Sequence, residues 1–194
     1  MDDITLPARD RILLTAHDLF YRDGIRASGI DRIIAESGVA KLTFYRHFSS
    51  KDELVKAFLQ YRHERWMAWF VDALGRHGAS DGGGLLPLVG TMDEWFENPG
   101  FRGCAFINVV AELGGDAEIA RIAHKHKTDM LRVIEALVDD KSIASAAAMA
   151  VDGAIVRAQM EATTVNSAGQ KKSARDGLRQ VLIALESASS GVPA

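Results

Sequence analysis

Apolar residues recur at helical spacing along almost the whole chain, and this pattern restricts the possible folds more than any other feature. Ile12, Ala16 and Leu19 fall on one helical stripe, and later segments repeat the spacing. No segment shows the sustained apolar and polar alternation of a half-buried strand. Glycine and proline punctuate the helical stretches, as at Asn98-Pro99-Gly100. The sequence predicts an all-α protein with helices over residues 7–23, 29–37, 40–47, 51–74, 85–97, 102–113, 116–138, 142–164 and 172–188.

The composition excludes several classes of protein. The chain has 194 residues, of which 47% are hydrophobic and 25% charged, as is usual for a globular protein that buries its own core. The single cysteine, Cys104, excludes an internal disulfide and a cysteine-based zinc site. No stretch approaches the roughly 18 consecutive apolar residues of a membrane span, and the first residues do not resemble a secretory signal. We therefore expect a cytoplasmic protein without a membrane partner.

The charge is unevenly distributed. The net charge of −3 divides into +1 over residues 1–65 and −4 over the remainder. Domains that bind nucleic acid usually carry a basic surplus, so the whole-chain value argues mildly against DNA. Any affinity of the N-terminal part for DNA would therefore depend on where its individual cations lie.

Two short predicted helices, at 29–37 and 40–47, are joined by a tight turn around Gly38. This is the layout of a helix-turn-helix, in which glycine supplies the backbone freedom of the turn. On the second helix Phe44 and Phe48 share one face and can pack inward. The other positions offer groups suited to phosphates and base edges in a major groove, namely Lys41, Thr43, Tyr45, Arg46 and His47. An ordinary polar surface helix is the alternative that spacing alone leaves open.

Residues 30–58 resemble the signature of the TetR (tetracycline-repressor-like) family of bacterial transcription regulators. The resemblance is carried by the Gly38-Val39 turn, the run Tyr45-Arg46-His47-Phe48 and the run Ser50-Lys51-Asp52-Glu53-Leu54. It is specific over residues 9–58 and extends beyond them only in length and helix number. It implies a three-helix helix-turn-helix domain over residues 1–62 that binds DNA. A long helix would join this domain to a helical domain over residues 63–194 that binds an effector and forms the dimer.

The resemblance also implies DNA contacts on the second short helix and close to it. The corresponding residues are Ser28, Lys41, Leu42, Thr43, Tyr45, Arg46, His47 and Lys51. Lys51 lies at a helix N-terminus, which itself favours an anion such as phosphate. Lys41 could contact a phosphate or a guanine edge, and Thr43 a phosphate or a thymine methyl, and the sequence does not decide between them.

Aromatic and methionine residues concentrate between residues 66 and 138, a segment that includes all three tryptophans. Such side chains line apolar ligand cavities, and TetR-like proteins hold an effector pocket among the corresponding helices. We predict a small, largely apolar effector bound by Trp66, Trp69, Phe70, Met92, Trp95, Phe106 and Met130. Burial in the core without any ligand is the alternative for each of them.

Two C-terminal segments carry stripes of small or aliphatic residues that suit close packing of helices. The resemblance identifies them as the two helices that each subunit contributes to a four-helix dimer interface. The predicted interface residues are Ala147, Val151, Ala154, Ile155, Ala158, Leu178, Leu182 and Leu185. A dimer would place two recognition helices about one DNA turn apart, roughly 34–36 Å, on a near-palindromic operator. Packing within one chain is the alternative.

Motifs of an enzyme are not found. The chain lacks H-E-x-x-H, Walker, G-x-S-x-G and dinucleotide fingerprints, and His124 and His126 diverge on a helix, so we expect no catalytic residue, metal or cofactor. We predict a homodimeric DNA-binding regulator, a repressor that a small apolar effector releases from its operator. The alternative is a DNA-binding protein without a ligand, whose C-terminal half serves only dimerisation or partner binding.

Overall fold

The computed structural model of the chain describes residues 6–162 and 171–190, and these residues form helices and connecting loops. The helices are α1 (Ala8–Asp23), α2 (Ile30–Ser37), α3 (Lys41–His47), α4 (Lys51–Arg76), α5 (Pro87–Phe96), α6 (Ala105–Leu113), α7 (Ala117–Glu135), α8 (Lys141–Ala162) and α9 (Lys171–Ser190). The all-α prediction is confirmed, and the helix ends agree to within a few residues. The predicted end of α8 at residue 164 lies outside the described residues. Among the described helices, none has both the length and the apolar character needed to cross a bilayer.

The chain divides into two compact units. The first contains the residues up to Glu64 and the segment Ala105–Ala123, and the second contains Arg65–Cys104 and the residues from His124 onward. Helices α4 and α7 therefore contribute residues to both units. The predicted boundary between residues 62 and 63 lies close to the division of the two units between Glu64 and Arg65, but that prediction placed α6 with the C-terminal part. That the chain divides into a DNA-binding domain and an effector-binding domain stays a prediction.

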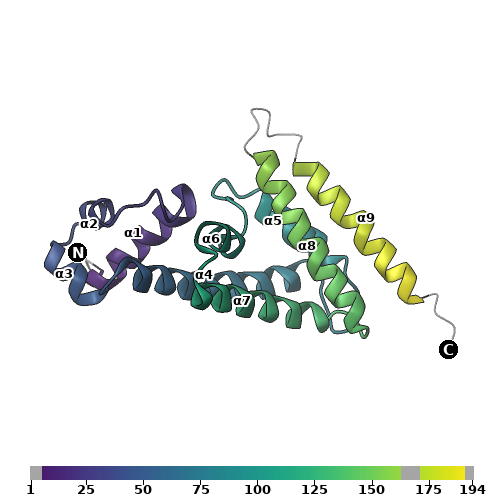
Figure 1. Ribbon diagram of the computed structural model, residues 1–194. Coiled ribbons are helices and arrows are strands. Elements are labelled where there is room, and N and C mark those ends of the chain that lie inside the picture. The colour runs from purple at the N-terminus through teal and green to yellow at the C-terminus, as the bar shows by residue number, and fades with distance from the viewer. Residues whose placement is uncertain (1–5, 163–170, 191–194) are drawn as a thin grey trace, which may run out of the picture. The chain divides into compact units, whose positions relative to one another are not determined.

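In the first unit, helices α2 and α3 pack against α1 (Figure 1). The stripe of α1 that the periodicity indicates, which includes Ile12 and Ala16, is fully buried. The turn between α2 and α3 contains Gly38 at φ +64°, a left-handed conformation that glycine adopts without strain. Arg11 Nη1 of α1 donates hydrogen bonds to the carbonyls of Ser37 (3.1 Å) and Gly38 (3.2 Å). The turn is therefore fixed by its own backbone conformation and by a side chain of α1.

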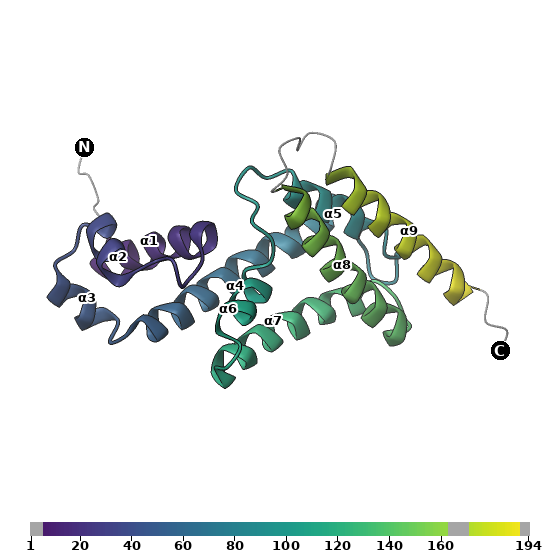
Figure 2. The ribbon, with the colours of Figure 1, turned by 45° about the horizontal axis from the view of Figure 1, so that its top comes forward.

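In the second unit, α8 and α9 run side by side as an antiparallel pair (Figures 1 and 2), and both contact α5. Small residues of α8, such as Ala147, and leucines of α9, such as Leu178, are buried in this packing. Small side chains let the helix axes approach each other closely. The stripes that predicted a dimer interface thus serve packing within the chain.

Candidate nucleic-acid interface

The orientation of α3 is set by two buried phenylalanines. Phe44 is fully buried and Phe48 nearly so, and their ring centroids lie 6.3 Å apart. The guanidinium of Arg9 in α1 lies 5.3 Å from the centre of the Phe48 ring. Successive residues of a helix are about 100° apart, so burial of Phe44 turns the opposite side of α3 outward. The inward face that the sequence predicts is confirmed by this burial.

The outward side of α3 presents a mixed surface without an acidic residue. Leu42 is 73% exposed and Tyr45 42% exposed, and the Tyr45 ring stands edge-on to Phe44 at 5.2 Å. The remaining predicted contacts on this helix are the exposed Lys41, Arg46 and His47 and the half-buried Thr43. Lys41 Nζ lies 3.5 Å from the carboxylate of Asp31, but both groups are exposed, and such pairs are weak. A phosphate could therefore replace this partner.

Two other predicted contacts lie elsewhere. Ser28 is fully buried, and its hydroxyl donates a 2.7 Å hydrogen bond to the carbonyl of Gly24, so the structure does not place it on the exposed surface. Lys51 is half-buried, and its Nζ donates a 2.5 Å hydrogen bond to the carbonyl of Ile25. Partial burial lowers the pKa of Lys51, which the carboxylate of Glu112 partly opposes. An ammonium has three donors, so Lys51 can bond a phosphate while it keeps its bond to the carbonyl of Ile25. The phosphate contact itself stays a prediction.

The loop between α1 and α2 is also held by α6, through a contact that the sequence did not predict. Glu112 accepts hydrogen bonds from the backbone N–H groups of Ile25 (3.2 Å) and Arg26 (2.9 Å). Gly24 has φ +92°, and a Cβ there would lie 3.1 Å from Glu112 Oε1. We refer to this arrangement of Glu112, Lys51 and the loop 24–26 as the loop clasp. No local pattern could reveal it, because Glu112 lies far along the chain from its partners.

Six of the seven predicted effector residues belong to the second unit, where the aromatic members contact one another. Trp66 stacks on Phe70 at 4.7 Å and meets Trp95 edge-on at 5.4 Å. Trp69 lies 6.0 Å from Trp95, and Met92 and Met130 are buried. The side chain of Trp66 is 6% exposed, yet its indole N–H has no hydrogen-bond acceptor among the described residues. A buried donor without an acceptor is uncommon in folded proteins.

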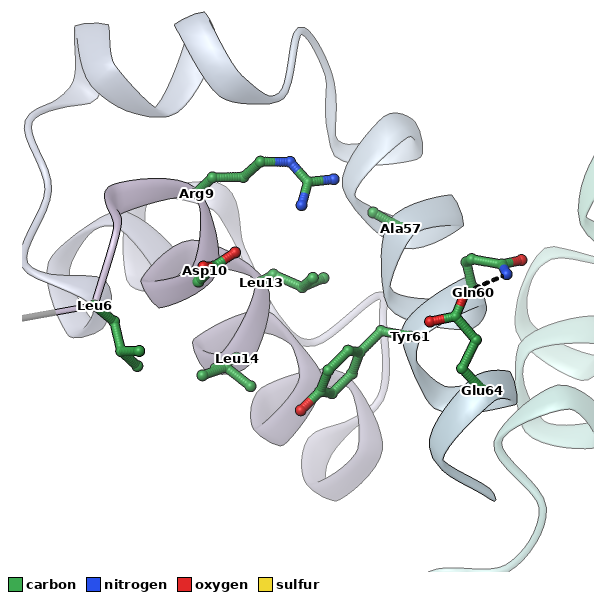
Figure 3. Close-up of a pocket in the computed structure, with 9 residues that line it drawn as sticks. All are labelled: Leu6, Arg9, Asp10, Leu13, Leu14, Ala57, Gln60, Tyr61 and Glu64. Atoms are coloured by element: carbon green, nitrogen blue, oxygen red, sulfur yellow. Dashed lines mark hydrogen bonds between the residues drawn. The ribbon is translucent and has the colours of Figure 1, made fainter. Parts of the chain in front are cut away.

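The seventh predicted residue, Phe106, belongs to the first unit, where its ring stands at 6.5 Å from that of His63. The first unit also has a groove of about 470 Å³ between α1 and α4 (Figure 3). Leu13, Leu14 and Tyr61 form its apolar part, and Gln60 donates a 2.7 Å hydrogen bond to Glu64 at its edge. None of the predicted effector residues lines this groove.

The predicted dimer residues are buried in the isolated chain, with the exception of the half-buried Leu185. Other residues of the same two helices face outward. On α8 these include Met149 and Met160, which are 73% and 66% exposed, and on α9 they include Val181. The predicted residues therefore pack within their own chain, and their part in a dimer interface stays a prediction.

Some known proteins resemble this chain over the helix-turn-helix region alone, and others over nearly its whole length. The family model described as "Bacterial regulatory proteins, tetR family" matches residues 12–58. The transcriptional activator FasR of Mycolicibacterium smegmatis is 46% identical over 55 residues, which is 28% of this chain and only 25% of FasR. SCO4454, a TetR-family transcriptional regulator from Streptomyces coelicolor, is 31% identical, with a TM-score of 0.78 over 92% of this chain and 95% of that chain. The multidrug binding protein EbrR, solved in complex with malachite green, shares the fold at 18% identity and a TM-score of 0.66, over 90% of this chain and 97% of EbrR.

The helix-turn-helix with its exposed α3, the match of the family model over residues 12–58 and the likeness to SCO4454 together identify a DNA-binding regulator of transcription. The agreement with SCO4454 extends this likeness from the helix-turn-helix to nearly the whole chain. The chain belongs to the TetR family of bacterial regulatory proteins.

Proposed function

We propose that the protein is a homodimeric repressor that binds a near-palindromic operator and is released from it by a small, largely apolar effector. The outward side of α3 supports the DNA-binding part of this proposal, because its cations, Tyr45 and Leu42 have no acidic neighbour on the same helix. Base edges and phosphates in a major groove require such groups. The relative FasR is named an activator, so the sign of regulation is part of what we propose.

Two exposed glycines support the dimer. Gly153 in α8 and Gly177 in α9 lie within helices, where glycine costs about 1 kcal/mol relative to alanine. A Cβ at either position would meet no described atom within 4 Å, so packing within the chain does not require a glycine. Close approach of a second copy would account for both. The outward stripes are largely apolar, and they are Met149, Gly153, Val156 and Met160 on α8, with the exposed Arg157 at their edge, and Gly177, Val181, Ala184 and Ala188 on α9.

The buried indole N–H of Trp66 supports the effector. Leaving such a donor without an acceptor costs about 1–3 kcal/mol, which a ligand with one acceptor atom would recover. The surrounding rings of Phe70, Trp95 and His126 would contact the apolar part of the same molecule. EbrR, a multidrug binding protein with the same fold, was solved in complex with malachite green. We therefore infer an effector that is largely apolar and aromatic and carries an acceptor toward Trp66.

The link between effector and DNA would be a shift between two conformations of the dimer that differ in the spacing of their recognition helices. Helix α4 supports this mechanism, because it is continuous from Lys51 to Arg76 and contributes to both units. The loop clasp adds a second connection, since Glu112 of α6 holds the loop that precedes α2. A movement of α4 or α6 would therefore be transmitted to the helix-turn-helix.

A titration tests the coupling between the two sites. The operator is a duplex selected by the protein from a random library, and the effector is the compound of an aromatic library that most stabilises the protein against heat. We expect the effector to bind about 5- to 150-fold more weakly when operator is present, because coupling between binding sites is reciprocal. Equal affinity with and without operator would contradict ligand-controlled release. Trp66→Phe, which keeps an aromatic ring and removes the N–H, should weaken the effector without changing operator affinity.

A further inference from the structure

Leu42 is an exposed aliphatic residue on the outward side of α3, where it lies beside residues that can form hydrogen bonds. Its side chain is 73% exposed, whereas the neighbouring Phe44 is fully buried. Its neighbours on the same helical face, Tyr45 and Arg46, can form hydrogen bonds with DNA, but Leu42 cannot. If α3 enters the major groove, this aliphatic side chain is favourable only against an apolar group of the DNA, because it cannot replace the hydrogen bonds of the polar groups that it would desolvate.

Base edges in the major groove offer one apolar group, the C5-methyl of thymine. Adenine, guanine and cytosine present only hydrogen-bond donors and acceptors there, and Leu42 would desolvate these without replacing their bonds. The same argument excludes phosphate oxygens as the partner. The chemistry of the side chain therefore selects one base.

We propose that Leu42 is a specificity-determining residue, which reads the 5-methyl group of one thymine in each half of the operator. The inference rests on the proposed function, because it requires that α3 enters the major groove. It assigns Leu42 to direct base recognition, and it distinguishes Leu42 from Lys41 and Arg46, whose charges serve phosphates as well as bases.

Replacement of thymine by deoxyuridine tests this assignment, since it removes the methyl group and leaves every hydrogen-bonding group of the base in place. A duplex selected by the wild-type protein from a random library is the probe. Each thymine is replaced in turn, and affinity is measured by fluorescence anisotropy. We expect one position in each half-site where deoxyuridine weakens binding about fourfold, the loss for one buried methyl group, and about fifteenfold when both halves are replaced.

Leu42→Ala should abolish this sensitivity at the same position, because the methyl group then has no partner. The side chain is largely exposed, so the substitution leaves no cavity and should not unfold the protein. Thr43→Ser is the matched control, because it removes the other methyl group on α3 that could contact thymine, and it should leave the sensitivity intact.

The outcomes separate this proposal from the proposed function. If the protein enriches no duplex, the function itself fails. If it binds a selected duplex but deoxyuridine has no effect at any position, or the effect persists in Leu42→Ala, the assignment of Leu42 is overturned. If Leu42→Ala weakens all duplexes equally, Leu42 contacts the backbone and the proposal is also overturned.

A second measurement uses only the wild-type protein. The thymine·adenine pair at the sensitive position is replaced by cytosine·guanine or by 5-methylcytosine·guanine, which differ from each other only in the methyl group. We expect the methylated duplex to bind about fourfold more tightly. Equal affinity for these two duplexes would contradict the reading of a methyl group.

Discussion

Val181→Glu is expected to dissociate the dimer and to weaken operator binding by about 10²- to 10⁴-fold, because each monomer then binds its half-site without its linked partner. Val181 is 45% exposed on the uncharged outward stripe of α9. A glutamate there would be buried against a second copy without a counter-ion. Sedimentation equilibrium measures the dimer, and anisotropy with the selected duplex measures operator affinity.

Ile183 provides the matched control. It is a similar aliphatic residue on the same helix with 42% exposure, but it lies on the opposite flank, beside the exposed Arg179. Ile183→Glu should leave both the dimer and operator affinity unchanged. Dissociation by both substitutions, or by Ile183→Glu alone, would show that the outward stripe of α9 is not the interface.

Gly153→Ala should have opposite effects on the stability of the single chain and on the association of two chains. Alanine should increase the stability of α8 by about 1 kcal/mol, since the added Cβ meets no atom of the described residues within 4 Å. In the dimer the same Cβ would hold the two helices apart and weaken their association. A more stable protein with an unchanged dimer would show that no second copy approaches Gly153.

The second large effect concerns stability. Phe44→Ala should lower the free energy of unfolding by about 3–5 kcal/mol, because the ring is fully buried where α3 packs and its removal leaves a cavity. Leu42→Ala, two residues earlier, should change it by less than about 0.5 kcal/mol, because Leu42 is on the surface. Urea unfolding followed by circular dichroism measures both. Similar losses for the two variants would contradict the orientation of α3.

Much of the fold follows from local patterns. Spacing of apolar residues places every described helix, and the pair Phe44 and Phe48 identifies the inward face of α3. The glycine at the turn of the helix-turn-helix has the left-handed conformation that its position requires. These features depend on residues close together in the chain, so the sequence is sufficient to predict them.

Features that depend on distant residues could not be predicted. The loop clasp pairs Glu112 with the backbone of Ile25 and Arg26, and backbone groups carry no sequence signal. The inward position of Ser28 depends on a local contact, since its hydroxyl donates to the carbonyl of Gly24 four residues earlier, but a hydroxyl near a helix start is equally compatible with an exposed capping position. Periodicity identifies the stripe that a helix buries but not what covers it, so the predicted dimer residues of α8 and α9 proved to face their own chain.

The most direct test of the central claim, that α3 recognises a specific operator, is selection from a random-sequence duplex library followed by sequencing. The wild-type protein should enrich two inverted half-sites with centres about one helical turn apart. A variant with Lys41→Ala, Leu42→Ala and Arg46→Ala, all exposed positions, should remain folded and enrich no common motif. No enrichment by the wild type, or the same motif enriched by the variant, would contradict the assignment of α3 as the recognition helix.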